Sequence, residues 1–99
     1  MPRPPIKRIL ESTIEAQLTA RVLDAGGLCD KVVALGRRGF FDRLVVLPGG
    51  RVVFVETKRP RGGRLSANQK ALHDAYRSRG CEVRVVRNVE DIEALLGEI

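Results

Sequence analysis

The sequence contains no tryptophan, and its aromatic residues are three phenylalanines and one tyrosine. A hydrophobic core must therefore consist mainly of Val, Leu, Ile and Ala, for which a hydrophobic content of 43% is sufficient. A chain of 99 residues can form one compact core but cannot hold a catalytic domain and a separate binding domain. We therefore expect one domain over residues 1–99, with residues 1–5 flexible.

Cysteine and long apolar runs are also scarce. Cys29 and Cys81 belong to no CxxC or Cys/His cluster, so neither a zinc site nor a disulfide framework is indicated. They are expected to be buried thiols in a reducing cytoplasm. No apolar run approaches the roughly 20 residues that cross a bilayer, and residues 1–5 lack the hydrophobic segment of a secretion signal. The sequence predicts a cytoplasmic protein with no membrane partner, from a bacterium or a phage-infected cell.

Positive charge is in clear excess. Eighteen Lys and Arg against twelve Asp and Glu give a formal net charge of +6, which favours a polyanionic partner. Nucleic acid is the leading candidate. The alternative is a solvated arginine-rich surface that binds nothing.

Helical spacing of apolar residues predicts a first helix from residue 6 or 12 to about residue 25, and Gly26-Gly27 supplies its stop. Two positions are possible for the start of this helix. Pro4-Pro5 could begin a long helix, or Ser12 could cap a shorter one with Glu15 closing a capping box.

Three strands are predicted next. Leu28 to about Leu35 is a short apolar run, and the basic connection 36–39 follows it. Phe40–Leu47 and Arg51–Lys58 are rich in β-branched and aromatic residues, and Pro48-Gly49-Gly50 between them predicts a hairpin turn.

The remaining segments complete an α/β pattern. A basic glycine-containing loop, Arg59–Arg64, leads to a second helix from Ser66 to about Arg79. Cys81–Arg87 is a fourth strand, and Asn88 caps a third helix that ends near Leu96. The order αβββαβα predicts a mixed sheet flanked by helices.

The hairpin carries three charged residues among apolar ones. Side chains alternate faces along a strand, so Glu56 and Lys58 share a face. A three-residue loop centred on Gly49 sets Asp42 directly across from Glu56. A two-residue turn would instead place the two carboxylates on opposite faces.

Two carboxylates about 5 Å apart at Cβ repel each other unless a cation lies between them or one is protonated. Carboxylate oxygens suit Mg²⁺ or Mn²⁺, which share coordination positions with substrate phosphate. Lys58 can then stabilise negative charge on an attacking water or on the phosphate. The alternative is a solvent-facing ion pair of Glu56 and Lys58, with Asp42 capping a turn.

From about Glu11 to Leu96, the chain resembles the VRR-NUC branch of the PD-(D/E)XK nucleases. The motif residues, in the family's order, are Gly39-Phe40-Phe41-Asp42-Arg43, Pro48-Gly49-Gly50, Val55-Glu56-Thr57-Lys58 and Gln69, with Glu15, Gly26-Gly27 and Lys31 fitting the same pattern.

The resemblance implies a restriction-endonuclease-like αβββαβα core that binds Mg²⁺ or Mn²⁺. It implies Glu15, Asp42 and Glu56 as metal ligands and Lys58 as the catalytic lysine. Gln69 matches the glutamine that the family places beside the catalytic centre.

Two acidic residues of the first predicted helix are candidates for the third metal ligand. Glu15 lies within a turn of Leu18 and Val22 on the inward side, where a carboxylate without a role is unusual, so we favour it over Glu11, one turn earlier.

Other residues have competing interpretations. Gln69 stands three after Ser66 and can also complete a capping box. Phe41 replaces the proline common before the family's aspartate, which leaves the local geometry open. Lys31 is a candidate substrate contact, and His73, which has no ligand partner at metal spacing, is expected to be exposed.

Basic residues flank the predicted site in sequence and can grip phosphates without reading bases, or can be solvated. The candidates for nucleic-acid contact are Arg37, Arg38, Arg59, Arg61, Arg64 and Lys31.

These features predict a metal-dependent endonuclease that hydrolyses DNA phosphodiester bonds. Selection by shape is more plausible than selection by base sequence in so short a chain. Resemblance to compact family members implies a homodimer that cuts branched DNA such as a four-way (Holliday) junction. The alternatives are a non-catalytic basic DNA-binding protein and a monomeric nuclease acting on flaps or single strands.

Overall fold

The computed structural model describes residues 10–37 and 39–97. Within these residues the elements follow the predicted order αβββαβα, which confirms the fold class. They are α1 (Glu11–Asp24), β1 (Leu28–Lys31), β2 (Arg43–Leu47), β3 (Arg51–Thr57), α2 (Ala67–Arg77), β4 (Glu82–Val86) and α3 (Val89–Gly97).

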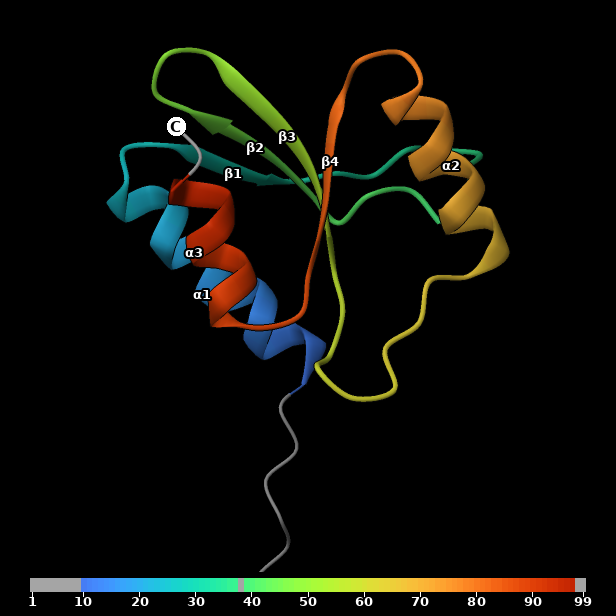
Figure 1. The fold of residues 1–99 in the computed structure, drawn as a ribbon, viewed down its shortest axis with the longest axis horizontal. Helices are drawn as coiled ribbons and strands as arrows, with labels where there is room; N and C mark the ends of the chain where they lie inside the picture. Colours follow the sequence, from blue (N-terminus) through green and yellow to red (C-terminus); the bar gives the residue numbers. More distant parts are fainter. Residues whose placement is uncertain (1–9, 38, 98–99) are drawn as a thin grey trace, which may run out of the picture.

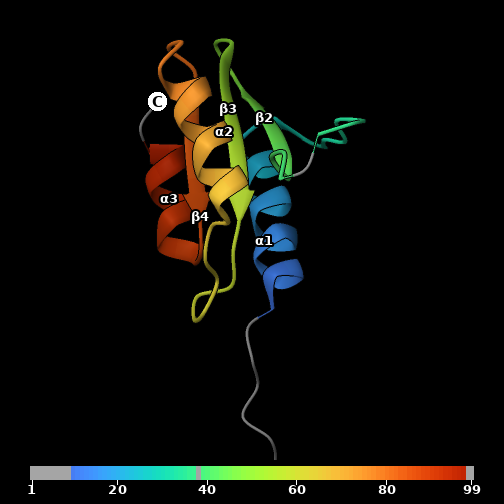
Figure 2. The ribbon, with the colours of Figure 1, turned by 90° about the vertical axis from the view of Figure 1, so that its right-hand side faces the viewer.

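The four strands form one mixed sheet in the order β1-β2-β3-β4. The pairs β1–β2 and β2–β3 are antiparallel, and β3–β4 is parallel. Helices α1 and α3 pack side by side on one face of the sheet, and α2 lies on the other face next to β4 (Figure 1 and Figure 2). Crossover through α2 is what allows β4 to run parallel to β3.

We call the sheet surface under α1 and α3 the α1–α3 face, and the opposite surface the α2 face. The apolar core fills the α1–α3 face, because every fourth residue of α1 points inward onto the strands. Its buried residues are Ile14, Leu18, Val22, Cys29, Val45, Leu47, Val53, Val55, Val86, Ile92 and Leu95. Cys29 is buried as predicted, whereas Cys81 is only half-buried.

Helix α1 begins at Glu11, and its N-cap residue Leu10 makes no side-chain capping bond. Ser12 lies inside the helix, so the predicted Ser12 capping box is wrong. The alternative start at Pro4-Pro5 lies outside the described residues. After the helix ends, Gly27 lets the chain pass close to β2, because a Cβ there would lie 2.8 Å from the carbonyl oxygen of Val46.

Two predicted strands are shorter than their apolar patterns. The first ends at Lys31, and beyond it Val33 and Leu35 are 76% and 94% exposed, because the chain leaves the sheet there. The second begins at Arg43 and not at Phe40, since Phe41 turns away to stack on residues of α2.

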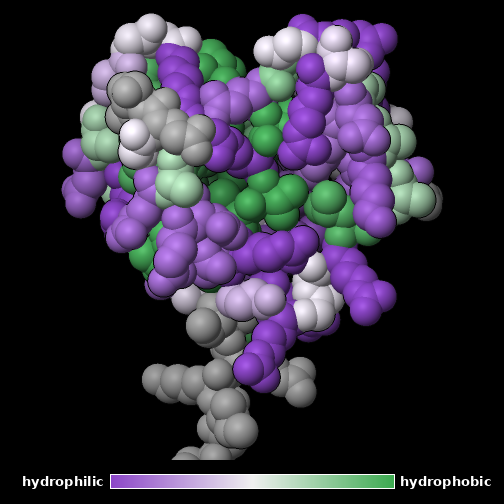
Figure 3. All heavy atoms as spheres, in the orientation of Figure 1, coloured by the Kyte–Doolittle hydropathy of each residue, from purple (hydrophilic) through white to green (hydrophobic). Residues whose placement is uncertain are grey.

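In the orientation of Figure 1, the surface has hydrophilic flanks over α3 and α2, and hydrophobic side chains gather between them over β4 (Figure 3). No helix in the described part of the chain is both long and apolar enough to cross a membrane.

Candidate active site

The β2–β3 hairpin has the predicted register. Leu47 pairs with Arg51 across the three-residue turn, and Arg43 pairs with Val55 at the far end. The amide of Asp42 donates to the carbonyl oxygen of Val55 (3.1 Å), which extends the pairing by one residue and sets Asp42 across from Glu56. The prediction that these two carboxylates are cross-strand neighbours is confirmed.

Asp42 is fixed by Thr57, the last residue of β3. Its Oδ2 accepts from the Thr57 amide at 2.7 Å and from the Thr57 hydroxyl at 3.0 Å. These bonds hold the carboxylate beside the end of β3.

Glu11 is the third member of the cluster. One carboxylate oxygen from each of Glu11, Asp42 and Glu56 can be chosen so that all three lie within 4.8 Å of one another. Glu11 occupies the first turn of α1, and this end of the helix lies beside the C-terminal end of β3. Glu11 was the second choice in the sequence interpretation.

Glu15 is not in this cluster, contrary to the sequence-based choice. Its Oε1 accepts from Nε of Arg43 at 2.7 Å, and Arg43 also donates to the carbonyl oxygen of Cys29 (3.3 Å). Arg43 alternates with Asp42 and points to the α1–α3 face, which α1 covers. Glu15 therefore meets an arginine there, and only the tip of α1 reaches the carboxylates on the other face.

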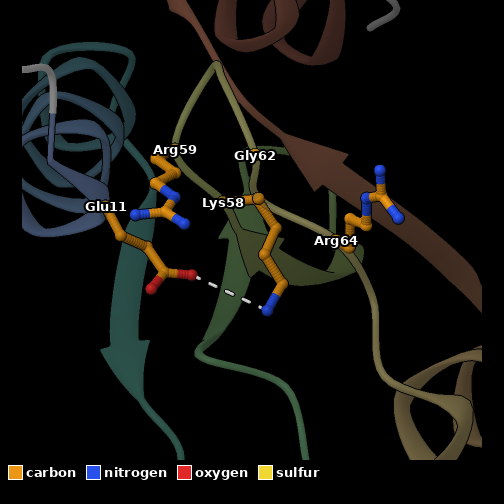
Figure 4. A pocket seen from close by; sticks show the side chains of 6 residues that line it. Glu11, Lys58, Arg59, Gly62 and Arg64 are labelled. Atoms are coloured by element: carbon orange, nitrogen blue, oxygen red, sulfur yellow. Dashed lines mark ion pairs between the residues drawn. The ribbon is translucent and has the colours of Figure 1, made fainter.

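Lys58 lies between two of the three carboxylates. Its Nζ is 3.8 Å from Oε1 of Glu11 and 4.0 Å from Oε2 of Glu56, and its side chain is 14% exposed. Figure 4 shows Lys58 and Glu11 pointing toward one another. The predicted convergence of an ammonium with the acidic pair is therefore present in the structure.

Glu56 is 2% exposed. Burial, followed by the hydrogen bond to Asp42 and its charge, raises the pKa of Glu56 from 4.5 to about 9, and Lys58 offsets this only in part. Without a cation this carboxyl group therefore holds a proton at neutral pH. A bound cation would favour the ionised form.

His73 is buried, and its predicted exposure is wrong. The side chain is 1% exposed and stacks on Phe41, with ring centroids 4.9 Å apart. Burial first, and then the charge of Arg77, lower the pKa of His73, which favours the neutral imidazole. The helical spacing of Gln69, His73 and Tyr76 was the available signal, because these positions share one stripe of α2.

Gln69 forms the predicted capping box with Ser66. Its side-chain oxygen accepts from the Ser66 amide (2.9 Å), and its own amide donates to the Ser66 hydroxyl (3.1 Å). These bonds fix the start of α2. A role for Gln69 beside the reacting phosphate stays a prediction.

A cleft of about 310 Å³ adjoins Glu11 and Lys58 (Figure 4). It is lined by Glu11, Lys58, Arg59, Gly62, Gly63 and Arg64. Two of the predicted DNA contacts, Arg59 and Arg64, thus lie beside the carboxylate cluster. Gly63 is needed for the tight loop, since a Cβ there would lie 2.7 Å from the Arg59 carbonyl oxygen.

The other predicted basic contacts do not line this cleft. Arg37, Arg61 and Lys31 are exposed but are not among its lining residues. Arg38 lies outside the described residues. Sequence interpretation missed Arg87, whose Nη1 donates to the carbonyl oxygen of Gly63 and ties the loop to the end of β4.

The residues present suit a hard divalent cation. Three carboxylate oxygens converge, and one of them belongs to the buried Glu56. Oxygen donors of this kind are the ligands that Mg²⁺ and Mn²⁺ prefer. A mixed sheet in the order αβββαβα, with acids and a lysine at the hairpin end, is the arrangement of restriction-endonuclease-like nucleases.

Comparison with known proteins refines this class. No family model matches the chain. The chain is 37% identical over 91 residues to "Putative nuclease p44" of Acyrthosiphon pisum secondary endosymbiont phage 1, covering 92% of this chain and 96% of that protein. A solved structure described as "VRR_NUC domain" superposes with a TM-score of 0.82 and 32% identity, covering 88% of this chain and 94% of that one. The chain belongs to the VRR-NUC family of nucleases.

Proposed function

We propose that this nuclease is a divalent-metal-dependent endonuclease that hydrolyses DNA phosphodiester bonds. The observation that carries the proposal is the convergence of Glu11, Asp42 and Glu56 around Lys58 at one end of the hairpin. Such a set can hold a cation and a phosphate together, and a solvated ion pair would not require two buried or half-buried carboxylates from adjacent strands.

In this proposal Glu11, Asp42 and Glu56 hold Mg²⁺ or Mn²⁺. A divalent cation at this centre would supply Lewis-acid stabilisation of the negative charge that develops on the phosphate. In the reaction a water oxygen bonds to phosphorus, and the bond from phosphorus to the leaving sugar oxygen breaks. One water proton passes to solvent, and the leaving oxygen takes up a proton.

Lys58 has two tasks that follow from its position. Its ammonium group offsets the negative charge of Glu11 and Glu56, and it faces the cleft where the phosphate would lie. There it orients the attacking water and stabilises the extra charge on phosphorus oxygens. Its side chain is only 14% exposed, so water screens this interaction weakly.

DNA is the proposed substrate because the cleft is lined by arginines. Arg59 and Arg64 line this cleft, and in this proposal they contact phosphates next to the reacting one. Such contacts carry no base information, so we propose selection by DNA shape, with branched or four-way-junction DNA preferred. A homodimer would bring two such centres to opposing DNA strands. We propose that the nuclease acts in the cytoplasm of a bacterium or a phage-infected cell.

The test is cleavage of end-labelled linear, flap and four-way-junction DNA with Mn²⁺, Mg²⁺ or EDTA. We expect cutting of the junction with either metal and none with EDTA. Asp42→Asn is the matched inactive control, since Asn keeps an oxygen for Thr57 but loses the charge.

Other outcomes would point to other functions. Metal-independent binding without cutting, even at high protein concentration, would mean a non-catalytic DNA-binding protein. Cleavage of flaps or single strands by a species that sediments as a monomer would mean a nuclease without paired sites. Symmetric nicks in a junction by a species of twice the chain mass would support the homodimer.

A further inference from the structure

Buried polar atoms without a partner are concentrated at one place in the described residues. They are Oε1 of Glu56 and both ring nitrogens of His73. A buried polar atom without a hydrogen bond costs about 1–3 kcal/mol. Orphaned atoms from β3 and α2 that face each other therefore call for an explanation beyond packing.

The two groups are nearly in contact. Nε2 of His73 is 3.7 Å from Oε1 of Glu56, and the side chains are 1% and 2% exposed. The other carboxylate oxygen of Glu56, Oε2, is the one near Nζ of Lys58. Glu56 thus presents one oxygen to the cleft side and one to the imidazole.

The imidazole is held in place by aromatic rings. Phe41 stacks on it with an interplanar angle of 17°, and Phe41 in turn packs against Phe54 and Tyr76 with centroids 5.1 Å from each. The ring therefore has little freedom to turn away from Glu56. Phe41 directly precedes Asp42, so this ring packing supports the carboxylates of both Asp42 and Glu56.

We propose that His73 is a positioning residue, which donates a hydrogen bond from Nε2 to Oε1 of Glu56 when the centre holds its cation and so keeps Oε2 directed at that cation. This inference rests on the proposed function. Closing the gap from 3.7 Å to an ordinary hydrogen bond needs a shift of only about 0.8 Å.

The physical reason is the cost of a buried negative charge. An ionised Glu56 with one oxygen on a cation would leave the other oxygen charged, buried and without a hydrogen bond. A fixed imidazole N–H removes that penalty and restricts the rotation of the carboxylate. Groups that orient ligands in this way typically contribute 10- to 100-fold to metal affinity.

The test compares His73→Phe, which keeps a stacked ring but has no donor, with His73→Gln, whose amide can place an N–H near the position of Nε2. Exposed Asp74→Asn, one residue along α2, is the control. Binding of Mn²⁺ to the full chain is measured without DNA, from the electron paramagnetic resonance signal of the free ion. We expect a 10- to 100-fold loss of affinity in His73→Phe, and values within about threefold of wild type in His73→Gln and the control.

Thermal unfolding without metal separates positioning from packing. His73→Phe should unfold at the wild-type temperature or above it, because the change removes two unsatisfied polar atoms. In cleavage assays at saturating Mn²⁺ its kcat should fall while KM for DNA is unchanged, since His73 does not line the cleft. Equal losses of Mn²⁺ affinity in His73→Phe and His73→Gln would assign His73 to packing alone and overturn the proposal.

A measurement on the wild-type chain keeps the test decisive if a variant fails to fold. His73 is the single histidine in the sequence, so its ¹⁵N resonances need no assignment. With Mg²⁺ bound, Nε2 should carry the proton, and an unprotonated Nε2 would overturn the proposal. If the wild-type protein binds neither Mn²⁺ nor Mg²⁺, both the role of His73 and the proposed metal-dependent function fail. If wild type binds Mn²⁺ and His73→Phe binds equally well, only the role of His73 fails.

Discussion

The two faces of the sheet are built from different kinds of side chain. On the α1–α3 face the apolar core consists of aliphatic residues and Cys29. On the α2 face the buried side chains include Glu56 and His73, and the His73 ring stacks on Phe41, which packs against Phe54 and Tyr76.

The two faces therefore serve different functions, one in folding stability and the other in the proposed chemistry. Burial of aliphatic side chains on the α1–α3 face contributes about 1.5–3 kcal/mol for each residue and makes folding possible. The α2 face accepts the cost of a buried acid and a buried imidazole at the position where a cation and a phosphate would bind. Changes on the two faces should therefore separate activity from stability.

The largest effect is expected from Lys58→Ala, on the α2 side of the hairpin end. Cleavage of junction DNA should fall by about 100- to 1000-fold or more, because the ammonium stabilises charge in the reaction. The unfolding temperature and most of the DNA affinity should remain, since the arginines are unchanged. Lys70→Ala, which removes an exposed lysine from α2, is the matched control. Full activity in Lys58→Ala would refute the site assignment.

The opposite result is expected from Leu18→Ala on the α1–α3 face. Leu18 is fully buried, so the substitution should lower the free energy of unfolding by about 3–5 kcal/mol. Urea unfolding measures the loss. In molecules that remain folded, Mn²⁺ affinity should be close to that of wild type, and a large change in affinity would break the division between the faces.

Glu11→Gln and Glu15→Gln sharpen the comparison within one helix. Glu11→Gln should weaken Mn²⁺ binding about tenfold or more, because it removes a charged member of the cluster. Glu15→Gln should instead cost about 1 kcal/mol of stability through the ion pair with Arg43. Mn²⁺ titration and thermal unfolding of both variants decide the point. The reversed pattern would restore Glu15 as the ligand.

The last comparison is the pH dependence of stability in EDTA. The pKa of Glu56 is about 9 in the folded chain and near the ordinary 4.5 when unfolded, so the folded state holds an extra proton between these values. The contribution of this proton to the free energy of unfolding is fully present below about pH 4.5 and is lost as pH rises through 9. The slope is at most about 1.4 kcal/mol per pH unit for one proton.

Glu56→Gln isolates this contribution, because the difference from wild type cancels other titrating groups. Urea unfolding at pH 5, 7 and 9 should give a wild-type free energy that falls relative to that of Glu56→Gln as pH rises. Parallel curves would show that Glu56 is ionised in the metal-free fold. Mn²⁺ should reverse the trend, since metal binding displaces the proton and strengthens with pH.

Several features followed from local rules. Side chains alternate along strands, and a three-residue turn sets the pairing, so Asp42 and Glu56 could be placed together from the sequence. Short-range capping likewise predicted the Ser66–Gln69 box. The order of elements came from periodicity and turn residues, which depend on neighbours in the chain.

The αβββαβα order, the register of the hairpin and the pairing of two acids with Lys58 could all be predicted from residue patterns alone. That Glu11 joins the cluster while Glu15 pairs with Arg43 depends on the packing of the folded chain, because helical spacing does not say which turn reaches the end of the sheet. This packing also decided the burial of His73, which depends on Phe41 leaving its strand to meet α2. Such contacts join segments far apart in the chain, and no local pattern encodes their distance.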